Sequence, residues 1–100
     1  MTPYHFHPEA EDELDETALF YESRVIGLGA SFVLEVERAV TAICEHPDLG
    51  HTFGKRTQRT LVHGFPYALI YGRHVDHILI LAVAHQHRRP GYWRSRSLAR

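Results

Sequence analysis

The sequence predicts an α+β fold, in which a short N-terminal strand and an antiparallel helical hairpin pack on one face of a three- to four-stranded antiparallel sheet. Two observations carry this prediction. Residues 9–43 repeat apolar side chains at helical spacing, whereas residues 59–84 are rich in β-branched and aromatic residues between short turns. A chain of 100 residues has a common single-domain length, so we expect one domain over residues 1–100.

The N-terminal residues predict a brief edge strand followed by a helix. Residues 3–6 are partly aromatic, and they precede His7-Pro8, where the fixed φ of proline suits the first turn of a helix. The acidic residues that follow favour a helix and complement its dipole. One apolar stripe has spacings of three and four residues and consists of Ala10, Leu14, Ala18, Tyr21 and Val25. We therefore expect an amphipathic helix with its acidic residues on the opposite face.

A second helix is expected after the turn Ile26-Gly27-Leu28-Gly29. Its apolar stripe consists of Leu28, Phe32, Val36, Ala39 and Ile43. His46-Pro47 ends this pattern, because the residue before a proline is disfavoured in a helix. The two helices therefore form an antiparallel hairpin. Residues 48–57 lack periodicity and contain two glycines, so they are expected to form a loop.

Strand patterns begin after this loop. Residues 59–63, 67–74 and 78–84 have strand-type composition and are separated by short connections, which predicts an antiparallel meander. Residues 78–84 are apolar on both faces of the pleat, as in a central strand that is covered from both sides. Since the helical hairpin covers one face, the other must be covered by the segment after His85, by a second copy of the chain or by a partner protein.

Acidic and basic residues are segregated along the chain. Residues 1–49 hold eleven of the twelve acidic residues and two arginines, whereas residues 50–100 hold nine of the eleven basic residues and a single acid, Asp76. Clustered basic side chains attract phosphate groups or acidic protein segments through a long-range field. The second half of the chain is therefore expected to bind a polyanionic partner.

The composition indicates neither a membrane protein nor a secreted one. No apolar run approaches the roughly 18 residues that a membrane span needs, and the N-terminal residues lack the pattern of a secretory signal. A single cysteine, Cys44, cannot form an internal disulfide and is expected to be a small buried hydrophobe. We expect a cytoplasmic protein.

The segment after the last predicted strand gathers side chains that could carry chemistry. Imidazole, guanidinium and aromatic groups follow one another from His85 to Arg94. RNA cleavage by an internal 2′-hydroxyl needs a base, an acid and cations around the phosphate. The candidates for these roles, expected to converge at the end of the sheet, are Arg59, Arg73, His85, His87, Arg88 and Tyr92. In the alternative interpretation, Tyr92 and Trp93 fold back over the sheet while the arginines stay solvated.

Nine histidines also raise the question of a metal site. His5 and His7 form one candidate pair of ligands, and His85 and His87 form another. A zinc site needs three or four ligands in a fixed geometry, and no cysteine or carboxylate lies near the second pair in sequence. We therefore expect surface histidines, no metal and no cofactor.

Other residues are candidates for binding a partner protein. Phe65-Pro66 is unusually apolar for a connection between strands, and Tyr67 and Tyr71 share a strand face that suits either the core or an interface. Trp93 either seals the sheet or anchors a partner. The full set of candidates is Phe65, Tyr67, Tyr71, Arg89, Trp93 and Arg94.

A series of short motifs spans nearly the whole chain. In order, they are Phe6-His7-Pro8-Glu9-Ala10, Gly27-Leu28-Gly29, His46-Pro47, Phe65-Pro66-Tyr67 and His85-x-x-Arg88-x-Pro90-x-Tyr92-Trp93. This combination resembles the RelE/ParE superfamily of toxins from bacterial type II toxin–antitoxin modules. The resemblance implies a helical hairpin on a twisted antiparallel sheet, and an antitoxin whose C-terminal segment wraps the toxin as a helix or an added strand in a hetero-oligomer.

The resemblance is closer to the ParE-like branch, whose members poison DNA gyrase, because the hairpin helices are long and the ending His-x-x-Arg-x-Pro-x-Tyr-Trp matches. The RelE-like branch cleaves mRNA on the ribosome with a basic cluster and a Tyr or His, and this chain has a single lysine, Lys55. We therefore expect a ParE-like toxin that is neutralised by a cognate antitoxin. The alternatives are a ribosome-dependent mRNA endoribonuclease, in which the six residues at the sheet end would be catalytic, and a non-toxic binding module.

Overall fold

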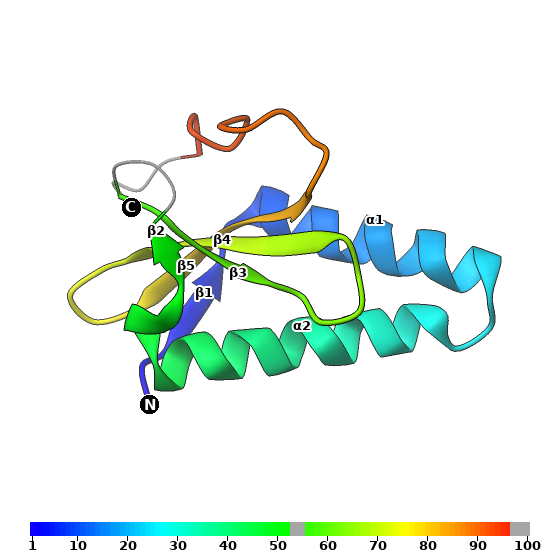
Figure 1. Cartoon of the computed structure of the whole chain (residues 1–100), viewed down its shortest axis with the longest axis horizontal. Coiled ribbons are helices and arrows are strands. Elements are labelled where there is room, and N and C mark those ends of the chain that lie inside the picture. The colour runs from blue at the N-terminus through cyan, green and yellow to red at the C-terminus, as the bar shows by residue number, and fades with distance from the viewer. Residues whose placement is uncertain (53–55, 97–100) are drawn as a thin grey trace.

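The predicted α+β fold is confirmed in a computed structural model of the protein, which describes residues 1–52 and 56–96 (Figure 1). Residues 53–55 of the predicted loop, including Lys55, and the end of the tail at 97–100 lie outside the described residues. The elements are β1 Tyr4–Phe6, α1 Pro8–Arg24, α2 Leu28–Glu45, the 3₁₀ turn η1 Pro47–Leu49, β2 His51–Thr52, β3 Gln58–Leu61, β4 Tyr67–Arg73 and β5 Ile78–His85.

The sheet has five strands in the order β1-β5-β4-β3-β2. β3, β4 and β5 form the predicted antiparallel meander, with Tyr67 opposite His85 at one end and Arg73 opposite Ile78 at the other. The predicted edge strand at residues 3–6 is confirmed as β1, and a further short strand, β2, brings the sheet to five strands, one beyond the predicted four. β1 runs parallel to β5 at one edge, and the two-residue β2 lies inside the predicted loop and pairs with β3.

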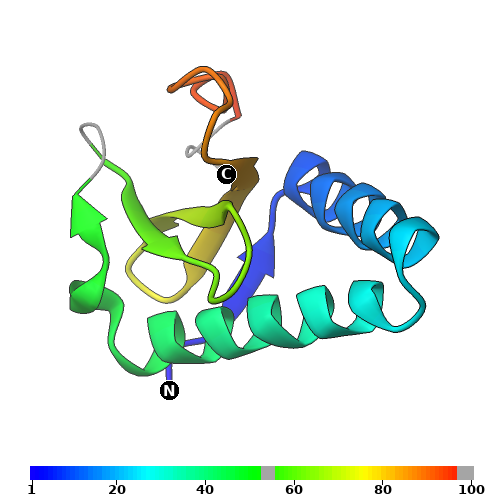
Figure 2. The same ribbon diagram turned by 45° about the vertical axis from the view of Figure 1, so that its right-hand side comes forward.

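The two helices form the predicted hairpin, and its turn projects beyond the sheet (Figure 2). In α2 the stripe members Phe32, Val36, Ala39 and Ile43 are buried, which confirms the predicted apolar face. In α1 Ala10 is buried and Leu14, Ala18 and Tyr21 pack partly buried against the same core. The inclusion of Val25 was wrong, because α1 ends at Arg24 and the Val25 side chain is 57% exposed. No helix in the described part of the chain is long and apolar enough to cross a membrane.

A carboxylate on α1 caps the start of α2. The Glu22 carboxylate accepts hydrogen bonds from the Gly27 N–H at 2.8 Å and the Gly29 N–H at 2.9 Å. These donors, Gly27 first, lower the pKa of Glu22. A Cβ at Gly29 would lie 2.4 Å from the Ala18 carbonyl oxygen, so glycine is needed for the close approach of the helices. The turn therefore fixes the hairpin through backbone donors and one small residue.

The tail, which we define as residues 86–96, covers the second face of the sheet. Trp93 is 4% exposed and packs with Ala68, Ile70 and Leu81, whereas the opposite face packs against the helices. The pairing of Ile70 with Ala82 and of Tyr71 with Ile80 leaves Leu81 as an extra residue in β5, a β-bulge that shifts the alternation of faces. The sequence left three candidates for covering the second face of the sheet. In the structure, the chain's own C-terminal segment covers it.

Candidate functional site

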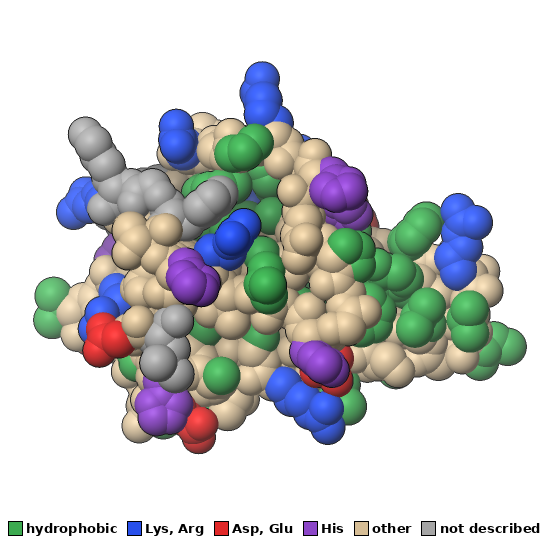
Figure 3. Space-filling model, in the orientation of Figure 1, with side chains coloured by type: hydrophobic (Ala, Val, Ile, Leu, Met, Phe, Trp, Pro, Cys, Tyr) green, Lys and Arg blue, Asp and Glu red, His purple; other side chains and the backbone are tan. Residues whose placement is uncertain are grey.

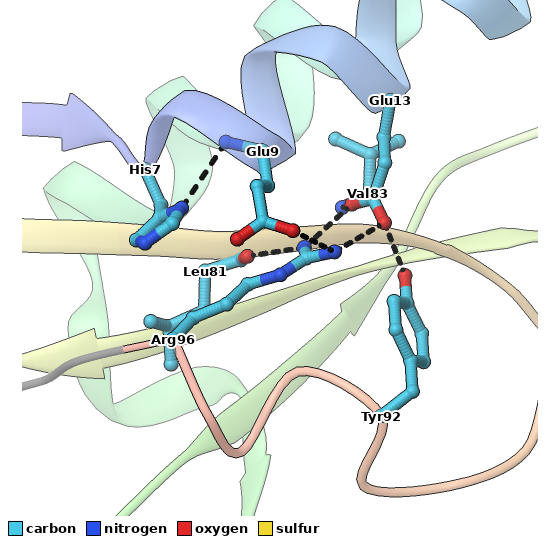
Figure 4. A network of polar contacts seen from close by, with 7 residues as sticks. All are labelled: His7, Glu9, Glu13, Leu81, Val83, Tyr92 and Arg96. Atoms are coloured by element: carbon cyan, nitrogen blue, oxygen red, sulfur yellow. Dashed lines mark hydrogen bonds and ion pairs between the residues drawn. The ribbon is translucent and has the colours of Figure 1, made fainter.

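An ion pair joins α1 to the tail (Figure 4). The Arg96 guanidinium donates from Nη1 to Glu13 Oε1 at 2.9 Å and from Nη2 to Glu13 Oε2 at 2.8 Å. The Arg96 side chain is 7% exposed and that of Glu13 is 14% exposed. The expectation that the acidic residues of α1 all face solvent is therefore wrong for Glu13. Amphipathic periodicity does not reveal a buried partner that lies 83 residues away in the sequence.

The same pair completes the hydrogen bonding of β5 beyond the end of β1. The Val83 N–H donates to Glu13 Oε1 at 2.9 Å, and the Leu81 carbonyl accepts from Arg96 Nη1 at 2.8 Å (Figure 4). β1 ends at Phe6, so these backbone groups have no strand beside them. Buried backbone groups without partners are costly, and the two side chains supply those partners. We call Glu13, Tyr92 and Arg96 the tail clamp.

Tyr92 is the third member of the clamp. Its hydroxyl donates to Glu13 Oε2 at 2.8 Å. Burial, and then the hydrogen bond to the Glu13 carboxylate, raise the pKa of Tyr92 well above its usual value near 10. The Arg88 guanidinium lies over the Tyr92 ring, 4.0 Å from its centroid. This tyrosine therefore keeps its proton and serves as a support for two arginines, since Arg96 also lies 5.0 Å from the ring centroid.

Four of the six predicted catalytic residues line one small pocket. The basic pocket, as we call it, encloses about 160 Å³ between β3, the end of β5 and the tail. Its polar wall contains Arg59, His85, Arg88 and Tyr92. The floor is formed by smaller and apolar side chains, among them Ala68, Ile70, Ala84 and Trp93. Arg59 reaches this site because it lies opposite Ile70, on the strand next to β4.

The other two predicted catalytic residues do not line this pocket. Arg73 lies at the opposite end of β4, about 20 Å along the strand from Tyr67 at roughly 3.3 Å per residue, and forms an ion pair with Asp48. The expectation that Arg73 converges with His85 was therefore wrong, because an antiparallel hairpin separates its two ends. The His87 ring lies 5.2 Å from that of His85, and the His87 N–H donates to His85 Nδ1 at 3.0 Å.

The predicted binding residues divide into core and surface. Tyr71 is fully buried and donates its hydroxyl to the Pro47 carbonyl at 2.9 Å, and Trp93 is buried under the tail. Phe65 and Tyr67 are partly buried and pack on Phe32, with ring centroids 5.0 and 5.3 Å away. Arg89 and Arg94 are exposed on the tail. Tyr71 and Trp93 therefore have structural roles here, and only the other four present side-chain surface.

A second concave surface lies at the free edge of β1. This β1 groove encloses about 660 Å³ between β1, α1 and α2. Apolar side chains of Leu14, Val36 and Val40 line it, together with the carboxylates of Glu11 and Glu37. The Pro3 carbonyl and the His7 N–H bond to β5, so the alternation of the strand turns the backbone groups of Tyr4 and Phe6 toward the edge that no described strand occupies.

Among the described residues, no group of three or more His, Cys, Asp or Glu side chains is arranged to hold a metal ion. Three histidines do gather at the β4–β5 turn. The rings of His74 and His77 stack 4.6 Å apart, and His5 lies 5.2 Å from His77. Burial raises the pKa of the Cys44 thiol, so this residue is a poor nucleophile in addition to being buried.

The comparisons with known proteins agree with this architecture. Residues 4–90 match a family model described as the ParE toxin of type II toxin–antitoxin system, parDE. The fold is similar to a solved chain titled "Chromosomal ParDE TA system from P. aeruginosa", with a TM-score of 0.71 and 16% sequence identity over 85% of this chain and 96% of that one. No curated protein matches the sequence.

Proposed function

The chain belongs to the ParE toxin family of type II toxin–antitoxin systems, and from this premise we propose that it inhibits DNA gyrase in the bacterial cytoplasm and is neutralised by a cognate antitoxin. The single observation that favours a binding protein over a ribonuclease is the state of Tyr92. Its hydroxyl is held by Glu13, and its raised pKa keeps the proton on the oxygen. A general base must already be deprotonated near working pH in order to accept a proton, and Tyr92 does not meet this condition.

The geometry of the other candidates supports the same conclusion. His85 accepts the His87 N–H at Nδ1, so only one ring nitrogen is left for proton transfer, and Arg73 is at the far end of β4. A base and an acid acting on one phosphate must both reach it. Among the described residues that line the pocket, Tyr92 is held by Glu13, and Arg59 and Arg88 are better suited to holding an anion than to exchanging protons, so no second proton-transfer group accompanies His85 there.

A ribosome-dependent endoribonuclease is the second candidate function, because Arg59, His85 and Arg88 line one pocket. This alternative makes a different prediction for mutants. Cleavage of mRNA on purified ribosomes would be lost in His85→Ala and in Arg88→Ala. Absence of cleavage at micromolar protein would remove this candidate.

The β1 groove is the site that we propose for the antitoxin. Its apolar lining favours apolar side chains, and Glu11 and Glu37 favour basic ones. The unpaired edge of β1 offers main-chain donors and acceptors to an extended segment. We therefore propose that a basic, apolar C-terminal segment of the antitoxin adds a strand beside β1. Co-expression with the product of the adjacent gene tests this proposal. We expect a stoichiometric complex, and we expect Glu11→Arg and Glu37→Arg to weaken it.

Induced expression of the chain alone in a bacterial host tests the target. The proposed function predicts early loss of pulse-labelled DNA synthesis with filamentation, and relief on co-expression of the antitoxin. Early loss of protein synthesis would instead favour the ribosomal target. Normal growth with folded protein present would leave the non-toxic binding module as the function.

A further inference from the structure

We propose that the basic pocket and the arginines around it bind the phosphodiester backbone of a nucleic acid, so that the toxin contacts the DNA held by its target as well as the target protein. That the nucleic acid is DNA rests on the proposed gyrase function. The pocket itself is observed in the structure, where residues of β3, β5 and the tail line it.

The first step is the charge of this region. Within described residues 56–96 there are seven arginines and one acid, Asp76. Arg73 pairs with Asp48, and Arg96 pairs with Glu13. Arg59 and Arg88 line the pocket, and Arg89 and Arg94 are exposed on the tail beside it. Basic side chains surround hydrophobic ones in the upper part of Figure 3.

The second step is the preorganisation of Arg88. Its guanidinium lies on the Tyr92 ring at 4.0 Å from the centroid, and Glu13 holds the hydroxyl of that ring. A guanidinium that is already oriented loses less freedom when it binds an anion. The planar fork of arginine matches the oxygens of a phosphate. The clamp thus positions Arg88 at the pocket. Of the three clamp residues, Tyr92 lines the pocket, whereas Glu13 and Arg96 do not.

The third step concerns size and the kind of contact. The pocket has a volume of about 160 Å³ and is lined by Arg59 and Arg88, whose guanidiniums suit the oxygens of a phosphate group. No carboxylate of the described residues lines the pocket. Base stacking is disfavoured because Trp93 is buried and Arg88 covers the Tyr92 ring. The contacts are therefore with the backbone, and binding is independent of base sequence.

Binding of a fluorescein-labelled DNA duplex to the purified full chain, followed by anisotropy over a series of salt concentrations, tests this inference. With about three phosphates neutralised, we expect a slope of about −3 for log K against log salt concentration. Arg59→Gln and Arg88→Gln should each reduce the magnitude of the slope by about 1. Arg24→Gln is the matched control, since Arg24 is exposed on the helical hairpin and the variant loses the same charge. Circular dichroism confirms that each variant is folded.

Each alternative outcome has a defined meaning. Equal losses in Arg24→Gln and Arg88→Gln, or no binding at low salt, would overturn the inference. Competition by poly-glutamate as strong as that by unlabelled duplex would assign the site to an acidic protein segment instead. A single-stranded RNA that binds more tightly than the duplex would assign the backbone to RNA. Gyrase inhibition without DNA binding would refute this inference alone, whereas DNA binding without gyrase inhibition would refute the proposed function alone.

Discussion

The two faces of the β-sheet are covered in different ways. On the helix face, two long helices contribute a continuous set of buried side chains that includes Phe32, Val36 and Ile43. On the tail face, a segment without helix or strand contributes one large buried side chain, Trp93, and the clamp of Glu13, Tyr92 and Arg96 holds the segment in place. Stability on the helix face is therefore distributed, while on the tail face it is concentrated in a few residues that also support the basic pocket.

Trp93→Ala is expected to have the largest effect. Removing a buried aromatic side chain costs about 3–5 kcal/mol, and Trp93 is the buried aromatic anchor of the tail, beside the partly buried Tyr92. Phe32→Ala on the helix face should cost a similar free energy of unfolding but leave the tail in place. Urea unfolding measures both costs. Binding of a hydrophobic dye to folded Trp93→Ala, but not to folded Phe32→Ala, would support the contrast, and equal dye binding would contradict it.

Glu13→Gln is expected to come next. It removes the closer of the two carboxylates that face the 7% exposed Arg96 guanidinium and leaves only Glu9 at 3.8 Å, and breaking a buried ion pair costs about 3 kcal/mol. Because the cost arises from the unpaired charge, the double variant Glu13→Gln, Arg96→Met should lose less than the sum of the two single variants. A double-mutant cycle by chemical denaturation measures this coupling. Strict additivity would mean that the pair does not act as a unit.

Tyr92→Phe removes one hydrogen bond to Glu13 and is expected to cost about 1–2 kcal/mol. It should also change the dependence of stability on alkaline pH. The folded-state pKa of Tyr92 is raised, so its contribution is present below the unfolded value near 10 and is lost as pH rises through the folded pKa. The variant should therefore lose less stability than the wild type above about pH 10. Parallel pH profiles would count against the clamp geometry.

Glu22→Gln tests the helix face and is expected to have the smallest effect at neutral pH. The pKa of Glu22 is lowered by the Gly27 N–H, so its contribution is present above the ordinary value of 4.5 and is lost as pH falls through the folded pKa. The variant should be less stable than the wild type at neutral pH, and the difference should shrink below pH 4.5. Thermal unfolding across this range measures the effect, with the exposed Glu16→Gln as control.

The sequence predicted the helix face better than the tail face. The stripe of α2 and the three strands of the meander follow from local periodicity, because 3.6-residue and two-residue repeats are properties of neighbouring residues. The brief edge strand β1 was also predicted, but β2 is too short to show a repeat, and the end of α1 before Val25 is set by the Glu22 cap on the next helix. Local pattern therefore predicts elements but not their terminal residues.

The candidate site was predicted only in part for a related reason. Arg59, His85, Arg88 and Tyr92 were identified from side-chain chemistry and lie together. Glu13 and Arg96 lie 83 residues apart in the sequence. They bond backbone groups of β5 beside a β-bulge and beyond the end of β1, and neither feature leaves a local signal in the sequence. Arg73 was misplaced because its position at the end of β4 was assumed to lie near the end of β5. In an antiparallel pair, the end of β4 lies beside the start of β5.

The most direct test of the central claim is supercoiling of relaxed plasmid by purified DNA gyrase in the presence of the purified chain. The account predicts loss of supercoiling at micromolar toxin, restoration on addition of the antitoxin, and a weaker effect for Arg88→Gln than for Arg24→Gln. Full supercoiling in the presence of folded toxin, together with cleavage of mRNA on purified ribosomes, would contradict it.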